Sequence, residues 1–180
     1  MRVVFMGTAE FACPSLAALD ESPGIEVVGV VTQPDRPKGR ELIPHPPAVK
    51  LEAELRNLPV HQPERLRNDI QYLEQIAPGL IIVAAYGQIL PQTILDLPPH
   101  GCLNVHGSLL PAYRGAAPIQ RAILDGQADT GVTIMQMDAG LDTGAMLSKT
   151  ATPIEPTDNA QTLHDRLAKL GAELLLEIIP

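Results

Sequence analysis

The stretch VVFMGTAEFACPSLAALDESPGIEVVGVVT, residues 3–32, decides the fold class of this chain. It opens with a short apolar run, Val3–Met6, that is typical of a buried strand. A helix is expected from about Pro14 to Glu21, because proline is favoured in the first turn of a helix. The run EVVGVVT at residues 26–32 is apolar and rich in β-branched valine, which predicts a second strand. Strand, helix and strand in this order are the pattern of an α/β protein.

The same alternation continues outward from this stretch. Further strands are expected at Leu80–Ala85, Cys102–His106, Thr130–Gln136 and Ala145–Thr152, with a short one near Val60. Further helices are expected at residues 47–56, 68–75, 91–97, 117–125 and 159–179. The loop between the last two strands is too short for a parallel crossover, so these strands should be antiparallel. The sequence therefore predicts an α/β fold: a doubly wound, mostly parallel Rossmann-like sheet with an antiparallel C-terminal strand pair.

Composition limits the classes of protein to which the chain can belong. Its 180 residues are 45% hydrophobic and 19% charged, which is ordinary for one globular domain. No apolar run reaches the roughly 18 residues that a membrane-spanning helix needs, and the first residues do not resemble a signal or transit peptide. We therefore expect a cytoplasmic protein. A net charge of −8 and an aromatic content of 3% argue against a surface devoted to binding nucleic acid.

One loop departs from this acidic balance. Residues 33–47 contain five prolines together with the basic residues Arg36, Lys38 and Arg40. We expect an irregular, proline-stiffened loop, and a loop of this length often has a function. From composition alone it is either a local site for an anionic partner or a solvated loop with ordinary charges.

The strand at residues 102–106 carries the side chains best suited to chemistry. Asn104 and His106 are two positions apart, so they project to the same face of the strand. They lie toward its carboxyl end, where open α/β sheets bind ligands. An asparagine amide can stabilise a developing oxyanion, and a histidine can donate or relay a proton. Asp138 and Asp142, in the loop after the next strand, are candidates to orient this histidine. An ordinary strand end with a hydrogen-bonded histidine remains the alternative.

Other chemistries lack their sequence patterns. The turn GTAEFA at residues 7–12 does not have the glycine spacing of a dinucleotide-binding loop, and no Walker lysine motif is present. Ser108 lacks the Gly-x-Ser-x-Gly context of a nucleophilic serine. Cys13 and Cys102 are too few for a disulfide scaffold, and both are expected to be buried thiols. The five histidines are scattered, so no metal site is predicted.

Two longer segments resemble one enzyme family. Residues 104–120, NVHGSLLPAYRGAAPIQ, resemble the central segment of folate-dependent formyltransferases, and residues 131–144, GVTIMQMDAGLDTG, resemble the second signature of that family. Residues 5–12, FMGTAEFA, and residues 32–37, TQPDRP, agree with this resemblance, which covers nearly the whole chain. The strings GAAPIQ and MQMD are most similar to the branch of the family that acts on methionyl-tRNA.

The resemblance implies a role for particular residues. Asn104, His106 and Asp142 match the catalytic trio of the family. The implied reaction transfers the formyl group of 10-formyltetrahydrofolate, a co-substrate, to the α-amino group of initiator methionyl-tRNA for translation initiation, without a metal. The residues expected to bind the folate are Ser108, Leu109, Leu110, Pro111, Gln88, Ile89, Leu90, Asp138 and Gly140. The residues expected to bind tRNA are Arg36, Lys38 and Arg40, with Arg40 as the leading contact.

Two positions depart from the family pattern. Ala112 stands where the family usually has a basic residue, and Glu41 interrupts a basic run that is usually longer. In the family, a smaller tRNA-binding barrel domain follows the region that this chain resembles. Residues 1–180 are therefore expected to be the formyltransferase catalytic domain alone, as a monomer that binds no membrane.

Two alternative functions remain open at this point. One is a sugar-nucleotide N-formyltransferase that uses the same trio, although the string GAAPIQ at residues 115–120 disfavours it. The other is a folate- or tRNA-binding module without catalysis, which Ala112 and the interrupted basic run motivate and the intact trio disfavours.

Overall fold

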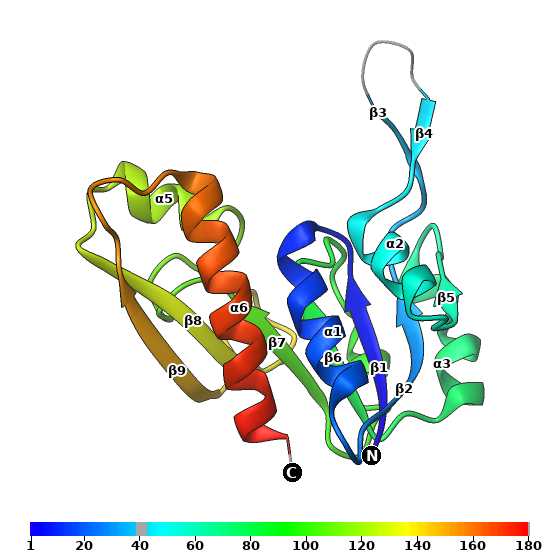
Figure 1. The fold of residues 1–180 in the computed structure, drawn as a ribbon. Helices are drawn as coiled ribbons and strands as arrows, with labels where there is room; N and C mark the ends of the chain where they lie inside the picture. The colour runs from blue at the N-terminus through cyan, green and yellow to red at the C-terminus, as the bar shows by residue number, and fades with distance from the viewer. Residues whose placement is uncertain (39–42, 180) are drawn as a thin grey trace.

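A seven-stranded sheet forms the centre of the molecule, with the strand order β5-β2-β1-β6-β7-β8-β9 (Figure 1). The structure, a computed structural model, describes residues 1–38 and 43–179. The strands of this sheet are β1 (Arg2–Gly7), β2 (Glu26–Val31), β5 (Val60–His61), β6 (Leu80–Ala84), β7 (Cys102–His106), β8 (Asp129–Gln136) and β9 (Met146–Pro153). The strands from β5 to β7 are parallel, whereas β8 is antiparallel to β7 and β9 to β8. The predicted doubly wound sheet with an antiparallel C-terminal pair is therefore confirmed.

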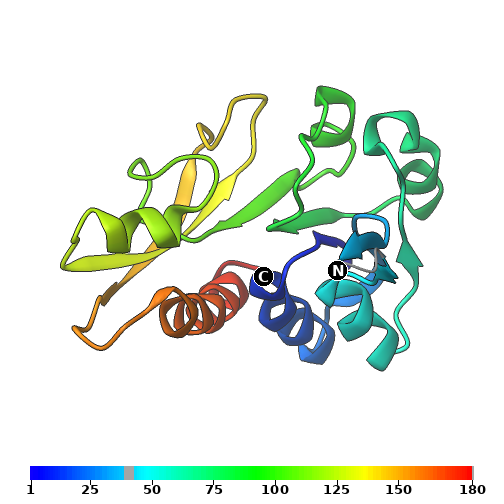
Figure 2. The same cartoon turned by 90° about the horizontal axis from the view of Figure 1, so that it is seen from above.

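Helices cover both faces of this sheet (Figure 2). The helices are α1 (Cys13–Glu21), α2 (Ala48–Leu55), α3 (Ile70–Ile76), α4 (Gln92–Leu95), α5 (Pro118–Leu124) and α6 (Ala160–Ile178), with 3-10 turns η1 (Glu10–Ala12) and η2 (Leu66–Asn68). Successive strand residues point to opposite faces, so each strand feeds two cores. In β1, Val3 and Phe5 pack with side chains of α1, α2 and α6, while Val4 and Met6 pack with side chains of α3 and α4.

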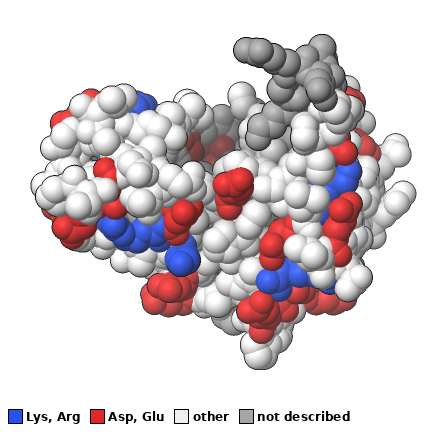
Figure 3. All heavy atoms as spheres, turned by 45° about the horizontal axis from the view of Figure 1, so that its top comes forward, with Lys and Arg blue, Asp and Glu red and all other residues white. Residues whose placement is uncertain are grey.

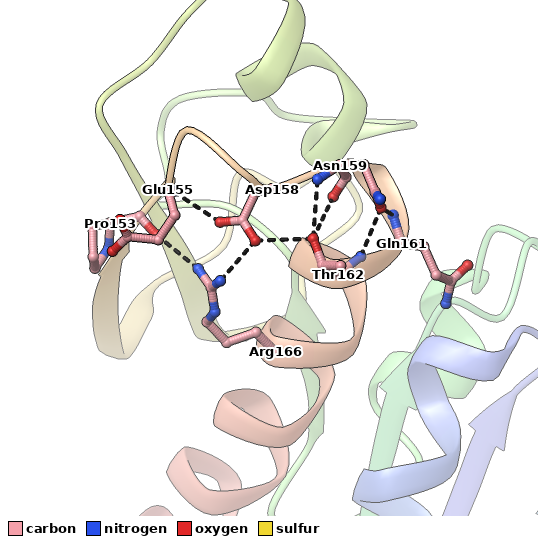
Figure 4. Close-up of polar contacts among 7 residues, drawn as sticks. All are labelled: Pro153, Glu155, Asp158, Asn159, Gln161, Thr162 and Arg166. Carbon is pink, nitrogen blue, oxygen red and sulfur yellow. Dashed lines mark hydrogen bonds and ion pairs between the residues drawn. The ribbon is translucent and has the colours of Figure 1, made fainter.

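The N-terminus of α6 is closed by side-chain hydrogen bonds (Figure 4). The side chain of Asn159 accepts from the backbone N–H groups of Gln161 and Thr162 at 2.9 and 3.0 Å. The hydroxyl of Thr162 in turn accepts from the backbone N–H of Asn159, which completes a capping box. The carboxylate of Asp158 binds Arg166 on the next turns of the helix at 2.7 Å. These contacts fix the residues of the first two turns of α6 against the loop after β9.

The predicted irregular loop at residues 33–47 is wrong in one respect. Residues Arg36–Lys38 and Ile43–His45 form an antiparallel pair, β3 and β4, that projects from the sheet at the top of Figure 1. Pro37 lies opposite Pro44 in this pair. Proline is tolerated in a two-stranded ribbon where its missing N–H would face away from the partner strand, so proline density did not exclude strands here. Four residues, 39–42, lie between the two described strands.

Three smaller differences concern the ends of elements. The expected helix at residues 68–75 is divided, because Asp69 has an extended φ of −135° between η2 and α3. The expected helix at 91–97 contains only Gln92–Leu95. Cys102 is a buried free thiol as expected, whereas Cys13, at the first turn of α1, is partly exposed. Within residues 1–38 and 43–179, no helix is long and apolar enough to span a bilayer.

Candidate active site

The side chains of Asn104, His106 and Asp142 meet in one place. Asn104 and His106 project from β7 on the side that carries Cys102, while Leu103 and Val105 pack into the opposite core. The side-chain amide of Asn104 donates to Oδ1 of Asp142 at 3.4 Å, and Nδ1 of His106 lies 3.6 Å from Oδ2. The His106 and Asp142 side chains are only 8% and 13% exposed, so little water screens their interaction.

The antiparallel run of β8 explains how Asp142 reaches β7. Leu103, near the start of β7, lies opposite Gln136, at the end of β8. The loop that follows β8 therefore begins beside the amino end of β7. It must cross the face of the sheet before Asp142 can reach His106, at the carboxyl end of β7. The backbone N–H of Gly115 donates to Oδ2 of Asp142 at 2.7 Å and holds the carboxylate there.

The loop at residues 137–145 is shaped by two further features. Oδ1 of Asp138 accepts from the backbone N–H of Gly140 at 3.0 Å and from the hydroxyl of Thr143 at 2.7 Å. Gly144 packs so closely on the end of β8 that an added Cβ would overlap the carbonyl oxygen of Gln136. Asp142 itself has a φ of 51°, a left-handed conformation that aspartate tolerates better than most residues. Asp138 thus supports the loop from within, and Asp142 is the carboxylate that reaches the histidine.

The imidazole of His106 is held from both sides. Its Nε2 lies 3.0 Å from the backbone carbonyl oxygen of Tyr113. A carbonyl oxygen only accepts hydrogen bonds, so this contact assigns the proton to Nε2 and leaves Nδ1 facing Asp142. A second proton on Nδ1 makes the ring a cation beside the Asp142 carboxylate. The ring can therefore gain and release a proton on the side that faces Asn104 and Asp142.

Residues 108–112 belong to the loop after β7, and hydrogen bonds fix its conformation. The hydroxyl of Thr133, on β8, donates to the carbonyl oxygen of Ser108 at 2.7 Å and accepts from the N–H of Leu110 at 3.0 Å. The hydroxyl of Ser108 donates to the carbonyl oxygen of Ala112 at 2.6 Å. Ser108 and Leu110 are buried, and the described lining of the cavity beside the trio includes neither them nor Leu109 and Pro111. The structure thus places Ser108–Pro111 outside this lining, and their direct contact with a folate stays a prediction.

A cavity of about 860 Å³ opens beside the trio. Five residues expected at the folate pocket do line it: Gln88, Ile89, Leu90, Asp138 and Gly140. Much of the remaining wall is apolar, with Val83 of β6, Met135 of β8 and Met137 just after β8. An apolar cavity with a few convergent polar groups, at the carboxyl end of the parallel strands, is the usual form of a small-molecule site in this fold class.

Tyr86 is a buried part of the wall of this cavity. Its side chain is 2% exposed, and its hydroxyl has no hydrogen-bond partner among the residues that the structure describes. Burial raises the pKa of Tyr86 to about 12, so the phenol stays neutral. Its backbone carbonyl accepts from the hydroxyl of Thr8 at 2.7 Å, which ties this wall to the end of β1.

A second cavity of about 590 Å³ adjoins the first. It is lined by Arg36 of β3, by His45 of β4 and by Glu10, and it shares Ala9 and His164 with the first cavity. The guanidinium of Arg36 makes an exposed contact of 3.9 Å with Glu64. On the face seen in Figure 3, basic and acidic groups are intermixed.

The three expected tRNA contacts differ in what the structure says of them. Arg36 lines the second cavity, and the backbone of Lys38 belongs to β3. Arg40 lies outside the described residues.

Some parts of the site carried no sequence signal. The carbonyl of Tyr113 and the N–H of Gly115 act through the backbone, which every residue type shares. His164 lies on α6, 58 positions after His106, and no sequence motif links it to the trio. Within the described residues, no group of three His, Cys, Asp or Glu side chains is placed to hold a metal ion.

Comparison with known proteins agrees with this geometry. A family profile described as "Formyl transferase" matches residues 1–179. The methionyl-tRNA formyltransferase of Geobacter sulfurreducens is 55% identical over 99% of this chain and 57% of its own length. That of Halorhodospira halophila is 56% identical over 99% of this chain and 58% of its own length. The chain thus spans less than two thirds of these relatives.

Solved structures share the fold at low sequence identity. A phosphoribosylglycinamide formyltransferase from Anaplasma phagocytophilum superposes with a TM-score of 0.81 at 21% identity, covering 98% of this chain and 84% of that one. At this identity the likeness concerns the fold alone. The match of the family profile over nearly the whole sequence is of a different kind, and by it the chain belongs to the formyltransferase family.

Proposed function

We propose that this chain transfers the formyl group of 10-formyltetrahydrofolate to the α-amino group of initiator methionyl-tRNA. The observation that carries the proposal is the meeting of Asn104, His106 and Asp142 at the wall of a largely apolar cavity. The relatives named methionyl-tRNA formyltransferase, at 55% and 56% identity, support this acceptor over a sugar nucleotide. The assignment of residues 1–180 to the catalytic part of a longer protein is part of the same proposal, as are a cytoplasmic location and a monomeric state.

The substrates supply both reacting groups, so the protein needs no nucleophile of its own. The amine nitrogen attacks the formyl carbon, a C–N bond forms, and the carbonyl electrons move to oxygen. The amide of Asn104 and a protonated His106 donate hydrogen bonds to that oxygen, and removing one such donor commonly costs about 10²–10³ in rate. When the carbonyl re-forms, the bond to the folate nitrogen breaks and that nitrogen receives a proton.

Asp142 has two tasks in this scheme. Its carboxylate, 3.6 Å from Nδ1 of His106, stabilises the imidazolium. It is also within reach of the amine proton that must move to the departing nitrogen. The hydrogen bond from Gly115 keeps the carboxylate oriented while this proton moves.

The proposed donor site is the first cavity. Gln88, Ile89, Leu90, Asp138 and Gly140 would contact the folate, and the apolar wall suits a flat heteroaromatic ring. Gln88 is itself restrained, because its Oε1 accepts from the N–H of Leu66 at 3.0 Å. Ser108–Pro111 are also proposed as folate-binding residues, on the resemblance of their segment to the family.

The proposed tRNA contacts are Arg36, Lys38 and Arg40, in the segment of β3 and β4. Phosphate contacts dominate the affinity of proteins for nucleic acids, and each one adds to the salt dependence of binding. A segment with few basic residues on a chain of net charge −8 is expected to bind tRNA weakly by itself. We expect the 180-residue chain to bind folate well and to hold tRNA less tightly than its longer relatives.

A single assay separates the candidate functions. The chain is given the formyl donor with either methionyl-tRNA in excess or an amino-sugar nucleotide, with His106→Ala as the inactive control. Formyl-methionyl-tRNA, formed by the wild type and not by the variant, is the expected product. Product from the sugar alone would favour the sugar-nucleotide function. Donor binding with no transfer to either amine would favour the non-catalytic module.

A further inference from the structure

The linings of the two cavities share two residues. His164, in the second turn of α6, and Ala9, after β1, belong to the lining of both. The trio lines the first cavity, whereas Arg36 and His45 of the β3–β4 pair line the second. A molecule that extends from the second cavity to the trio therefore passes Ala9 and His164, and only His164 has a polar side chain there.

The ring of His164 is held in a defined orientation. Its Nδ1 lies 2.9 Å from Oδ1 of Asp165, and that carboxylate also accepts from the side-chain amide of Gln161 at 2.8 Å. The edge of the ring meets Phe11, with centroids 5.6 Å apart and planes at 68°. The capped start of α6 fixes the backbone beneath these contacts (Figure 4). The His164 side chain is 22% exposed, so part of it remains open to the cavities.

The hydrogen bond to Asp165 decides what the other ring nitrogen can do. A carboxylate accepts, so Nδ1 of His164 carries the proton, and the hydrogen bond from His164 is the leading cause that lowers the pKa of Asp165. In the neutral ring, Nε2 then has a free lone pair, and it has no hydrogen-bond partner among the described residues. An acceptor nitrogen at this place suits a ligand that brings N–H or O–H donors.

We infer that the second cavity receives the aminoacyl-nucleoside end of the acceptor and that Nε2 of His164 accepts a hydrogen bond from it, setting the amine against the trio. This inference rests on the proposed function, because it gives the amine substrate of that reaction a place. A ribose hydroxyl or the α-amine itself supplies the donor. The volume of about 590 Å³ is within the usual range for ligand sites, roughly 300–1,000 Å³.

The other groups around the second cavity fit the same class of ligand. Arg36 offers a guanidinium to a phosphate at the outer side, since its exposed contact with Glu64 is a weak one. Glu10 offers a carboxylate to an ammonium or a hydroxyl, and the side-chain amide of Gln33 donates to the carbonyl of Tyr86 at 3.4 Å. The lining therefore includes a cation, Arg36, and a carboxylate, Glu10, which suit the phosphate and the amine of an aminoacylated nucleotide.

Binding of a stable analogue tests this inference without the reaction. The probe is 3′-amino-3′-deoxyadenosine joined to methionine through an amide, titrated into the 180-residue chain by calorimetry. The variants are His164→Ala, His164→Gln, which keeps an acceptor oxygen near the place of Nε2, and His100→Ala. His100 is exposed and lies outside the lining of both cavities, so it serves as the matched control.

The expected pattern is specific to the acceptor. His164→Ala weakens binding of the analogue about tenfold, the size of one lost hydrogen bond to a charged or strongly polar group. His164→Gln stays within about threefold of the wild type, and His100→Ala is unchanged. Because His164 also lines the first cavity, His164→Ala is expected to weaken donor binding less than analogue binding. His100→Ala leaves both affinities unchanged.

Three results would overturn the inference: no binding of the analogue to the wild type, equal affinity in His164→Ala, or equal losses for donor and analogue. The formyl-transfer assay is scored separately. If the analogue binds in a way that depends on His164 but no amine is formylated, the proposed function is refuted and the acceptor site at His164 is supported. If methionyl-tRNA is formylated equally well by His164→Ala, the proposed function is supported and the acceptor site at His164 is refuted.

Discussion

The carboxylate of Asp142 lies 3.6 Å from Nδ1 of His106, although the two residues belong to different segments of the chain. The contact exists because β8 runs antiparallel to β7 and the chain after β8 returns over the face of the sheet. The same carboxylate accepts hydrogen bonds from Asn104 and from the backbone of Gly115. One side chain thus joins the strand, the loop after it and the loop at residues 137–145.

The substitution Asp142→Asn tests the charge at this junction. The amide oxygen of the variant could still accept from Gly115, but a neutral amide cannot stabilise a cationic His106. We therefore expect kcat to fall about 10²–10³-fold while the KM for the donor changes little. Steady-state formylation kinetics measure both values. Asp129→Asn, at an exposed carboxylate that starts β8, is the control and should keep full activity. A large rise in donor KM with unchanged kcat would contradict the assigned role.

Gly144→Ala tests the close packing of the loop that carries Asp142. The new Cβ would overlap the carbonyl oxygen of Gln136, so the loop must move and Asp142 must shift from His106. We expect lower activity together with a moderate loss of stability, about 1–3 kcal/mol. Gly79→Ala is matched, because its Cβ would have 3.4 Å to its nearest neighbour. Activity and unfolding midpoint should be unchanged there, and equal effects at both glycines would disprove the steric argument.

The contacts of Asp158 predict a dependence of stability on pH. The backbone N–H of Glu155, followed by Thr162 and Arg166, lowers the pKa of Asp158 in the folded chain. The ionised form therefore stabilises the fold above the unfolded pKa of about 4, and this contribution is lost as the pH falls further. Urea unfolding at pH 7 and pH 3 should show a smaller difference for Asp158→Asn than for the wild type. Parallel behaviour of the two proteins would contradict this; Asp129→Asn should match the wild type.

Leu167→Ala tests the core beneath α6. Leu167 is fully buried between α6 and the sheet, and truncation leaves a cavity that neighbours cannot fill, so we expect a loss of about 2–5 kcal/mol. Leu124, at the end of α5, is 83% exposed, and Leu124→Ala should change stability by less than about 0.5 kcal/mol. Chemical denaturation measures both. Similar values for the two variants would show that α6 is not packed as described.

The trio could be predicted from the sequence, because its function depends on the types of its side chains and on their spacing. Asn104 and His106 share a face because strand residues two apart always do, and Asp142 was expected in a loop able to return over the sheet. The residues expected at the folate pocket fall into two groups, only one of which lines the cavity. Gln88, Ile89, Leu90, Asp138 and Gly140 line the cavity, while Ser108 and Leu110 are buried and bind Thr133 through their backbone. Which side of a loop faces a cavity depends on its hydrogen-bond partners, and those lie far along the chain.

The sequence by itself determined the layered α/β fold and the strand pairing at its end. Hydrophobic runs, their spacing and the lengths of connections are local properties, and they leave few ways to bury apolar surface. Only the tertiary structure decided that β3 and β4 pair, that the backbone of Tyr113 and Gly115 holds the trio, and that His164 joins two cavities. These features depend on contacts between segments distant in sequence, made by backbone groups that every residue type carries.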